Sequence, residues 1–328
     1  MDISSKIIAI IPLQILAIVA YLSIAKRLNL YDNPNERSSH KEKVIRGGGV
    51  IIPVSLILYS LFFGLHHFFI MGVLLVAIIS FVDDIIHINA FIRLAIHFIA
   101  VSFVFMDIHR EINYSPIIVI LVSILAVAAV NAYNFMDGIN GMTGLYTLTV
   151  YESIFFYNYY FTPLFDTNLL IILSIAIVIF LFFNLRSQAK MFSGDVGSIS
   201  LGLLAVFYVL YLIVHTQSLI YLSLLAVYGV EAGMTVLLRL FKKQNIFQAH
   251  RMHLFQDLVN IVGIPHIKVS LFYSLIQLFI NFGIFLCIKC KFSGYLYFTY
   301  ITLILIAIYV IVKFYIHNNL EKYNHAKN

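Results

Sequence analysis

Long apolar runs dominate this sequence and limit what it can fold into. Of its 328 residues, 62% are hydrophobic and only 11% are charged, whereas about 25% of the residues in a soluble domain are charged. About 20 apolar residues in a helix are enough to cross the hydrocarbon core of a bilayer. The sequence therefore predicts an all-α, polytopic integral membrane protein. We count eleven apolar spans, at about 6–25, 48–65, 67–82, 91–106, 116–132, 143–161, 168–185, 197–214, 218–238, 269–288 and 296–316.

Positive charges are distributed unevenly between the two sets of connecting loops. The loops after the first, third, fifth, seventh and ninth spans, together with the C-terminal tail, carry most of the Lys and Arg residues. Because Lys and Arg accumulate on the cytoplasmic side of membrane proteins, we predict an N-terminus outside and a C-terminus in the cytoplasm. Residues 1–328 are expected to form one transmembrane domain, with residues 317–328 as a short cytoplasmic tail. The formal charge of +6 then reflects topology and does not indicate nucleic-acid binding.

The polar motifs of the sequence all fall in loops predicted to face the cytoplasm. The stretch 131–144 reads NAYNFMDGINGMTG and lies between two apolar spans. Asn and Asp are costly near lipid unless they are paired or functional. Structural polar residues would be divided between the two faces, so their gathering on one face predicts a single composite site. The structural alternatives are an interhelical turn, a solvated helix cap or a positively charged anchor.

Three of these motifs carry charged side chains, and in two of them Gly residues lie beside the charge. Adjacent carboxylates at Asp83 and Asp84 repel each other unless they are solvated, paired or metal-bound, and Mg²⁺ prefers carboxylate, water and phosphate oxygens. Arg46 precedes three Gly residues, whose N–H groups can face a phosphate. Asp195 lies between two Gly residues at a helix start, where it can cap the helix or act as a further metal ligand.

The long loop after the ninth span contains the sequence HRMHLFQ at residues 250–256. His residues three positions apart can share one helix face, where they could contact a phosphate. No further soft ligand is adjacent, so zinc is not expected. Carboxylates, a hard cation, Arg and His at one membrane face favour phosphoryl transfer. The sequence has neither a Walker A motif nor a GxGxxG motif.

The order of these motifs resembles that of the polyprenyl-phosphate N-acetylhexosamine-1-phosphate transferases of glycosyl transferase family 4. The motifs are Arg-Gly-Gly-Gly, Asp-Asp, Asn-x-x-Asn-Phe-x-Asp-Gly-x-x-Gly, Gly-Asp-x-Gly-Ser and the His-containing loop, from about residue 29 to residue 256. The resemblance implies that undecaprenyl phosphate attacks the β-phosphorus of a UDP-N-acetylhexosamine, which releases UMP and initiates a lipid-linked cell-surface polysaccharide such as O-antigen. It also implies a bacterial inner-membrane location, a cytoplasmic active site and Mg²⁺, with Mn²⁺ as a substitute ion. Membrane lipid is an expected partner, nucleic acid is not, and the resemblance leaves a homodimer open.

The resemblance also assigns roles to individual residues of this sequence. Asp195 is expected to bind Mg²⁺. Asp83 is expected to deprotonate or position the lipid phosphate, with Asp84 in support, although a covalent nucleophile in this pair stays open. Substrate contacts are expected at Arg46, Asn131, Asn134, Asp137, Asn140, His250, Arg251 and His253.

Some features separate the chain from the muramoyl-pentapeptide branch of that family. Its fifth-loop motif is less rich in His, Asn140 stands where that branch has Asp, and eleven spans differ from ten. HRMHLFQ is more similar to the O-antigen branch that transfers N-acetylfucosamine or N-acetylquinovosamine phosphate. The main alternative is a transporter that uses intramembrane carboxylates, and a scaffold is a third. The transporter is disfavoured because no inverted repeat is evident and the polar residues lie at span ends.

Overall fold

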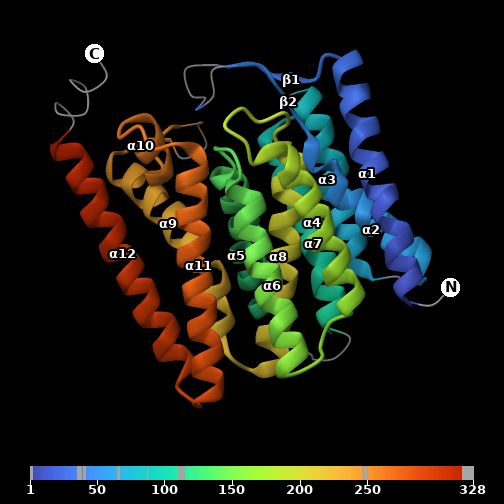
Figure 1. The fold of residues 1–328 in the computed structure, drawn as a ribbon. Helices are drawn as coiled ribbons and strands as arrows, with labels where there is room; N and C mark the ends of the chain where they lie inside the picture. The colour runs from blue at the N-terminus through green and yellow to red at the C-terminus, as the bar shows by residue number, and fades with distance from the viewer. Residues whose placement is uncertain are drawn as a thin grey trace.

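Helices make up most of the computed structural model, which describes residues 3–34, 39, 42–64, 67–86, 88–109, 115–245, 248 and 250–319 (Figure 1). Two short 3₁₀-helices, η1 (Gly48–Val50) and η2 (Leu219–Leu225), precede α2 and α9. The α-helices are α1 (Ile3–Arg27), α2 (Ile51–Phe63), α3 (Phe68–Ile85), α4 (Ala90–His109), α5 (Pro116–Met136), α6 (Met142–Tyr160), α7 (Thr167–Asn184), α8 (Gly194–Thr216), α9 (Ala226–Phe241), α10 (Leu254–Asn260), α11 (His266–Lys289) and α12 (Gly294–Asn318).

The all-α prediction is confirmed, and each predicted span coincides with helical structure. Within the described residues, nine helical segments are long and apolar enough to cross a membrane, counting η2 with α9 as one segment. Two predicted spans do not reach this standard. The segment Gly48–Phe63 is too short, and α6 carries Thr and Glu side chains among its apolar ones. The crossing of the membrane by these two helices therefore stays a prediction.

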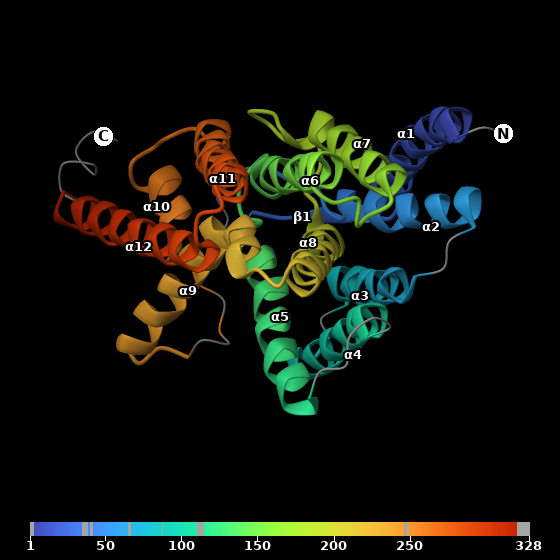
Figure 2. The same ribbon diagram turned by 90° about the horizontal axis from the view of Figure 1, so that it is seen from below.

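Helix α8 lies at the centre of the bundle, where α3, α5 and α6 pack around it (Figure 2). In its most apolar window 83% of the residues are buried, against 11% for the peripheral α12. Helices in lipid approach closely where their residues are small. Gly202 of α8 packs directly against Tyr133 of α5, since an added Cβ atom would lie 2.9 Å from the Tyr133 Cβ atom. The central position of α8 brings its N-terminal end close to several other helix ends.

A small antiparallel strand pair, which was not predicted, closes one end of the bundle. Strand β1 (Tyr31–Asp32) pairs with β2 (Val44–Ile45), and Ile45 also forms a parallel bridge to Met191. These pairings tie the loop after α1 to the loop after α7. Figure 1 shows the strands and α10 at the same end of the bundle, opposite the beginning of α1. The predicted tail 317–328 lies outside the described residues from residue 320 onward.

Candidate active site

Arg46 connects two carboxylates that come from different helices. Its Nη2 atom lies 2.7 Å from Oδ1 of Asp84, near the end of α3, and 3.2 Å from Oδ1 of Asp195, in the first turn of α8. The Tyr21 hydroxyl donates a 2.6 Å hydrogen bond to the Arg46 carbonyl and holds this loop in place. Burial lowers the pKa of Arg46, but Asp84, Asp195 and Asp32 together raise it above its ordinary value. The guanidinium therefore remains charged between the two carboxylates.

Arg93 of α4 forms a second bridge on the other side of Asp195. Its Nη1 atom lies 2.5 Å from Oδ2 of Asp83 and 3.6 Å from Oδ2 of Asp195. The Ile88 amide donates a 2.7 Å hydrogen bond to the second Asp83 oxygen. Asp195 thus lies between two guanidinium groups. We call Arg46, Asp83, Asp84, Arg93 and Asp195 the carboxylate–arginine cluster.

Two glycines allow the loop that carries Arg46 to approach α8 closely. The amide of Gly49 donates a 2.9 Å hydrogen bond to the Ser193 carbonyl. A Cβ atom added to Gly49 would lie 2.1 Å from the Cα atom of Gly197. Gly194 has φ +69°, a conformation that other residues rarely adopt. The glycines of both motifs therefore set the distance between Arg46 and Asp195.

We expect Gly49→Ala to destabilise the protein, because the new methyl group would overlap backbone atoms of α8 that cannot move independently. Overpacking of this kind typically costs about 1–3 kcal/mol, which a thermal unfolding measurement in detergent would detect. Gly229→Ala is the matched control, since nothing lies within 4 Å of its added Cβ atom. A Gly49→Ala protein that unfolds at the same temperature as the control would show that the two loops do not pack this closely.

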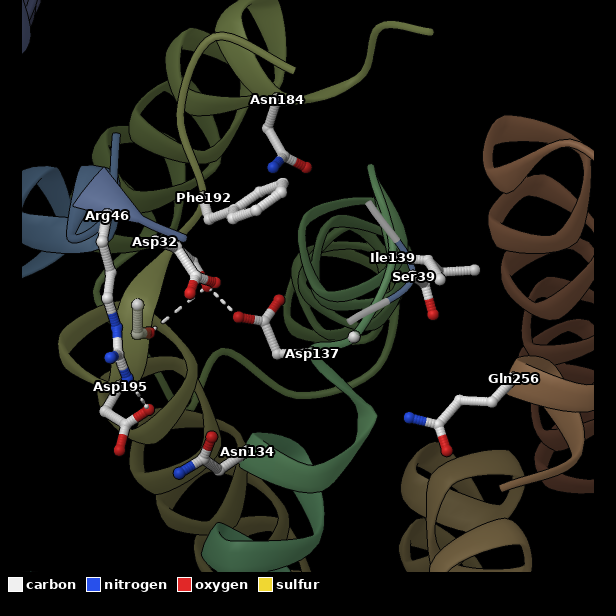
Figure 3. Close-up of a pocket in the computed structure, with 13 residues that line it drawn as sticks. Asp32, Ser39, Arg46, Asn134, Asp137, Ile139, Asn184, Phe192, Asp195 and Gln256 are labelled. Carbon is white, nitrogen blue, oxygen red and sulfur yellow. Dashed lines mark hydrogen bonds and ion pairs between the residues drawn. The ribbon is translucent and has the colours of Figure 1, made fainter. Parts of the chain in front are cut away.

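A polar cavity of about 250 Å³ opens next to the cluster. Figure 3 shows Asn134, Asp137 and Asp195 around it. The Ser193 hydroxyl donates a hydrogen bond to Asp137, and the Ser198 hydroxyl donates one of 3.4 Å to the Asn134 side chain. Burial raises the pKa of Asp137 to about 6. The complete lining is Asp32, Ser39, Arg46, Asn134, Asp137, Gly138, Ile139, Asn184, Phe192, Ser193, Gly194, Asp195 and Gln256.

The oxygen donors in this cavity fit a hard divalent cation. Asp137 and Asp195 both line it. Burial disfavours the charged form of Asp137, and a bound cation would stabilise that form. Among the residues that the structure describes, no three His, Cys, Asp or Glu side chains converge into a complete ligand set. Mg²⁺ does not need one, because it usually keeps several waters and binds through one or two carboxylates and substrate phosphates.

Two of the predicted substrate contacts point elsewhere. Asn131 donates a 2.8 Å hydrogen bond to the Val127 carbonyl and lies 3.5 Å from Nδ1 of His97. Asn140 is buried, and its side-chain amide donates a 2.7 Å hydrogen bond to the Arg186 carbonyl. Neither residue lines the cavity. The contacts of Asn140 hold the loop after α7 against the loop after α5, so Asn140 connects two loops of the structure.

The predicted His residues lie at the start of α10, beside α5. The rings of His250 and His253 are 5.0 Å apart, and both face Phe135 at 6.4 Å. Burial lowers the pKa of His250 to about 4 and that of His253 to about 3, so both imidazoles are neutral at pH 7. Arg251 is exposed. The structure therefore offers neutral hydrogen-bonding groups at this loop, together with one exposed cation.

Three residues of the site, Ser193, Asn184 and Gln256, carry no role in the sequence-based prediction. The hydroxyl of Ser193 completes the contacts of Asp137. Asn184 accepts a 2.6 Å hydrogen bond from the Gly141 amide and donates one of 2.9 Å to the Met191 carbonyl. A polar residue at the end of an apolar span was the available signal for Asn184. Gln256, the last residue of the HRMHLFQ motif, reaches the cavity from α10.

Comparison with known protein families gives one match. The model described as Glycosyl transferase family 4 matches residues 66–213. The match covers less than half of the chain, includes Asp83, Arg93, Asp137 and Asp195, and supports assignment to this family. Arg46 and the His-containing loop fall outside it. No match was found among curated proteins.

Proposed function

We propose that this chain transfers an N-acetylhexosamine-1-phosphate from a UDP-sugar to undecaprenyl phosphate and releases UMP. The family match and the apolar helices support a membrane glycosyltransferase, which implies a sugar-phosphate donor and a lipid acceptor. The observation that carries the proposal is the carboxylate–arginine cluster at the edge of a polar cavity. Phosphoryl transfer depends mainly on positioning and on neutralising charge, and this cluster has groups for both.

The polar cavity is the proposed place of the donor diphosphate. Arg46 lies at its wall and can turn from the carboxylates to a phosphate oxygen, since its side chain is 32% exposed. Asp195 and Asp137 are the residues that would hold Mg²⁺, and the bound ion would neutralise charge on the diphosphate. The Asn134 side chain lines the cavity and supplies a hydrogen bond for the nucleotide or the sugar. His250 and His253 do not line it, so their contact with the substrate stays a prediction.

In the proposed reaction, an oxygen of the lipid phosphate forms a bond to the β-phosphorus of the donor. The bond from that phosphorus to the bridging oxygen breaks, and UMP leaves. Asp83 accepts the proton of the attacking phosphate, because carboxylate oxygens that already accept hydrogen bonds retain further lone pairs. Arg93 and the Ile88 amide fix the orientation of the Asp83 carboxylate. Asp84 supports the site by holding Arg46.

A direct assay tests this proposal. Purified protein is incubated with undecaprenyl phosphate, Mg²⁺ and a panel of UDP-N-acetylhexosamines that includes N-acetylfucosamine and N-acetylquinovosamine donors, and UMP release is recorded. We expect release with one donor, and none when the lipid or Mg²⁺ is omitted. If folded protein that binds lipid phosphate releases no UMP with any donor of the panel, the result would contradict the proposal. Solute flux into liposomes would then favour a transporter.

We also propose a bacterial inner-membrane location with the cluster facing the cytoplasm. The native Cys290 is exposed at the C-terminal end of α11, and Ser39 lines the polar cavity at the other end of the bundle. In a Cys287→Ser background, Cys290 should react with an impermeant maleimide added outside intact cells. In a protein with Cys287→Ser, Cys290→Ser and Ser39→Cys, labelling should require inverted membranes. The reverse pattern would overturn the orientation.

A further inference from the structure

A second cavity, of about 460 Å³, lies between α9, α10, α11 and α12. It is larger than the polar cavity of about 250 Å³. Eleven of its fifteen lining residues are aliphatic or Phe, and the others are Glu231, Lys268, Tyr273 and Tyr309. Figures 1 and 2 show these four helices grouped on the side of the bundle away from α1, with α10 at the end that carries the strands. Three of the helices that form its walls, α9 (counted with η2), α11 and α12, are long and apolar enough to cross a membrane.

The cavity extends along the helix axes. On α11 it is lined from Lys268 to Ile276, and on α12 from Leu305 to Val312. Eight residues of helix span about 12 Å, which is close to the depth of one leaflet of a hydrocarbon core of about 30 Å. An apolar space of this depth, parallel to membrane helices, fits an extended hydrocarbon chain.

The two charged side chains that line this cavity, Glu231 and Lys268, differ in their partners. The Glu231 carboxylate accepts hydrogen bonds from the Leu254 amide at 2.5 Å, the Phe255 amide at 3.3 Å and the Tyr273 hydroxyl at 2.5 Å. Lys268 is exposed near the beginning of α11, and its side chain forms no hydrogen bond or ion pair with the described part of the chain. The rim of the apolar cavity thus presents one positive charge with which an anion can pair.

We propose that this cavity binds an acyl chain of an anionic phospholipid, whose phosphate contacts Lys268. Basic residues near the membrane surface attract anionic lipids, and the bilayer supplies the chain that fills the apolar space. The lipid is distinct from the acceptor of the proposed reaction. Helix α10 separates the two cavities, since Gln256 lines the polar one while Leu254 and Leu258 line this one. This inference therefore does not depend on the proposed reaction.

The bound chain would also stabilise the start of α10. Glu231 and Leu254 line the lipid cavity, and Oε1 of Glu231 lies 3.8 Å from Nδ1 of His253. The same carboxylate accepts hydrogen bonds from the first two backbone amides of α10. A lipid packed against these residues therefore supports the loop that carries His253 without contacting the polar cavity.

The chain contains no Trp, so a single introduced Trp reports on its own surroundings. Phe272→Trp places the probe in the cavity wall, and Phe314→Trp places it on α12 outside the cavity. The two positions are comparably exposed, since the native side chains are 56% exposed at Phe272 and 67% exposed at Phe314. Each variant is reconstituted in phosphatidylcholine vesicles with a minor share of phosphatidylglycerol. In parallel samples, one or the other lipid carries brominated acyl chains, which quench Trp emission.

We expect brominated phosphatidylglycerol to quench the Trp at position 272 with about fivefold preference over brominated phosphatidylcholine, after correction for composition. Lys268→Gln should remove this preference, whereas Lys289→Gln at the other end of α11 should leave it. The Trp at position 314 should show none. Equal quenching at both positions, or no quenching at position 272 by either lipid, would overturn the proposal. So would displacement of the brominated lipid by substoichiometric undecaprenyl phosphate, because the occupant would then be the acceptor.

Discussion

Asp195→Asn is expected to lower the turnover number by at least about 10³-fold. Asp195 lies between Arg46 and Arg93, lines the polar cavity and is the residue proposed to hold Mg²⁺. Removal of its charge weakens the cation site and leaves Arg46 to pair with Asp84 alone. Metal ions supply several kcal/mol of charge stabilisation in such reactions, and about 4 kcal/mol corresponds to this change in rate. UMP release measured over a range of Mg²⁺ concentrations gives the result.

Two controls make the Asp195 result specific. Glu152→Gln removes an exposed carboxylate of α6 that does not line the polar cavity, and it should leave turnover unchanged. Asp195→Glu keeps the charge and should retain part of the activity, with a higher Mg²⁺ requirement. If Asp195→Asn works at the normal rate and Mg²⁺ concentration, the residue is not part of the metal site.

Asp83→Asn is expected to lower turnover by about 10²–10⁴-fold, the range of a general base, while binding of the nucleotide sugar largely survives. The carboxylate of Asp83 contacts Arg93 and the Ile88 amide, and it does not line the polar cavity. The two contacts fall on different oxygens of Asp83, so the amide oxygen of Asn keeps one of them and loses the other. The amide also cannot take a proton from the acceptor. Binding is measured by calorimetry with the UDP-sugar, and turnover by UMP release.

Asp107→Asn is a close match for this experiment. Asp83 and Asp107 are each 7% exposed, and each accepts a 2.7 Å hydrogen bond from a backbone amide. Asp107 lies in α4, away from the cluster, so its substitution should affect stability and leave the turnover of folded protein unchanged. Loss of donor binding in Asp83→Asn would contradict the general-base role and point to a structural or metal-related one.

The sequence was sufficient for the helical architecture because the bilayer allows few solutions. Each apolar run predicted as a span coincides with helical structure, since a backbone in lipid must satisfy its own hydrogen bonds. The two weaker spans show where composition fails. The segment Gly48–Phe63 begins as a 3₁₀-helix and is short, and α6 is polar enough to depend on burial inside the bundle.

Prediction of the site was less complete, and individual residues show why. Asp84, Asp195 and Arg46 were each identified and are in contact. Asn131 and Asn140 belong to the same motif as Asn134 and Asp137, yet only the latter two line the cavity. Adjacent motif positions on a turn point in different directions, and a sequence does not specify which of them faces a cavity.

The sequence by itself determined that the chain is a bundle of apolar helices with its polar motifs at helix ends, because burying those motifs in lipid would be too costly. Only the tertiary structure decided which charges pair. Arg46 and Asp195 are 149 positions apart, and their contact depends on Gly49 packing against Gly197. Arg93 became part of the cluster because α4 packs against α3. Long-range packing fixes such contacts, and hydropathy and local motifs do not encode it.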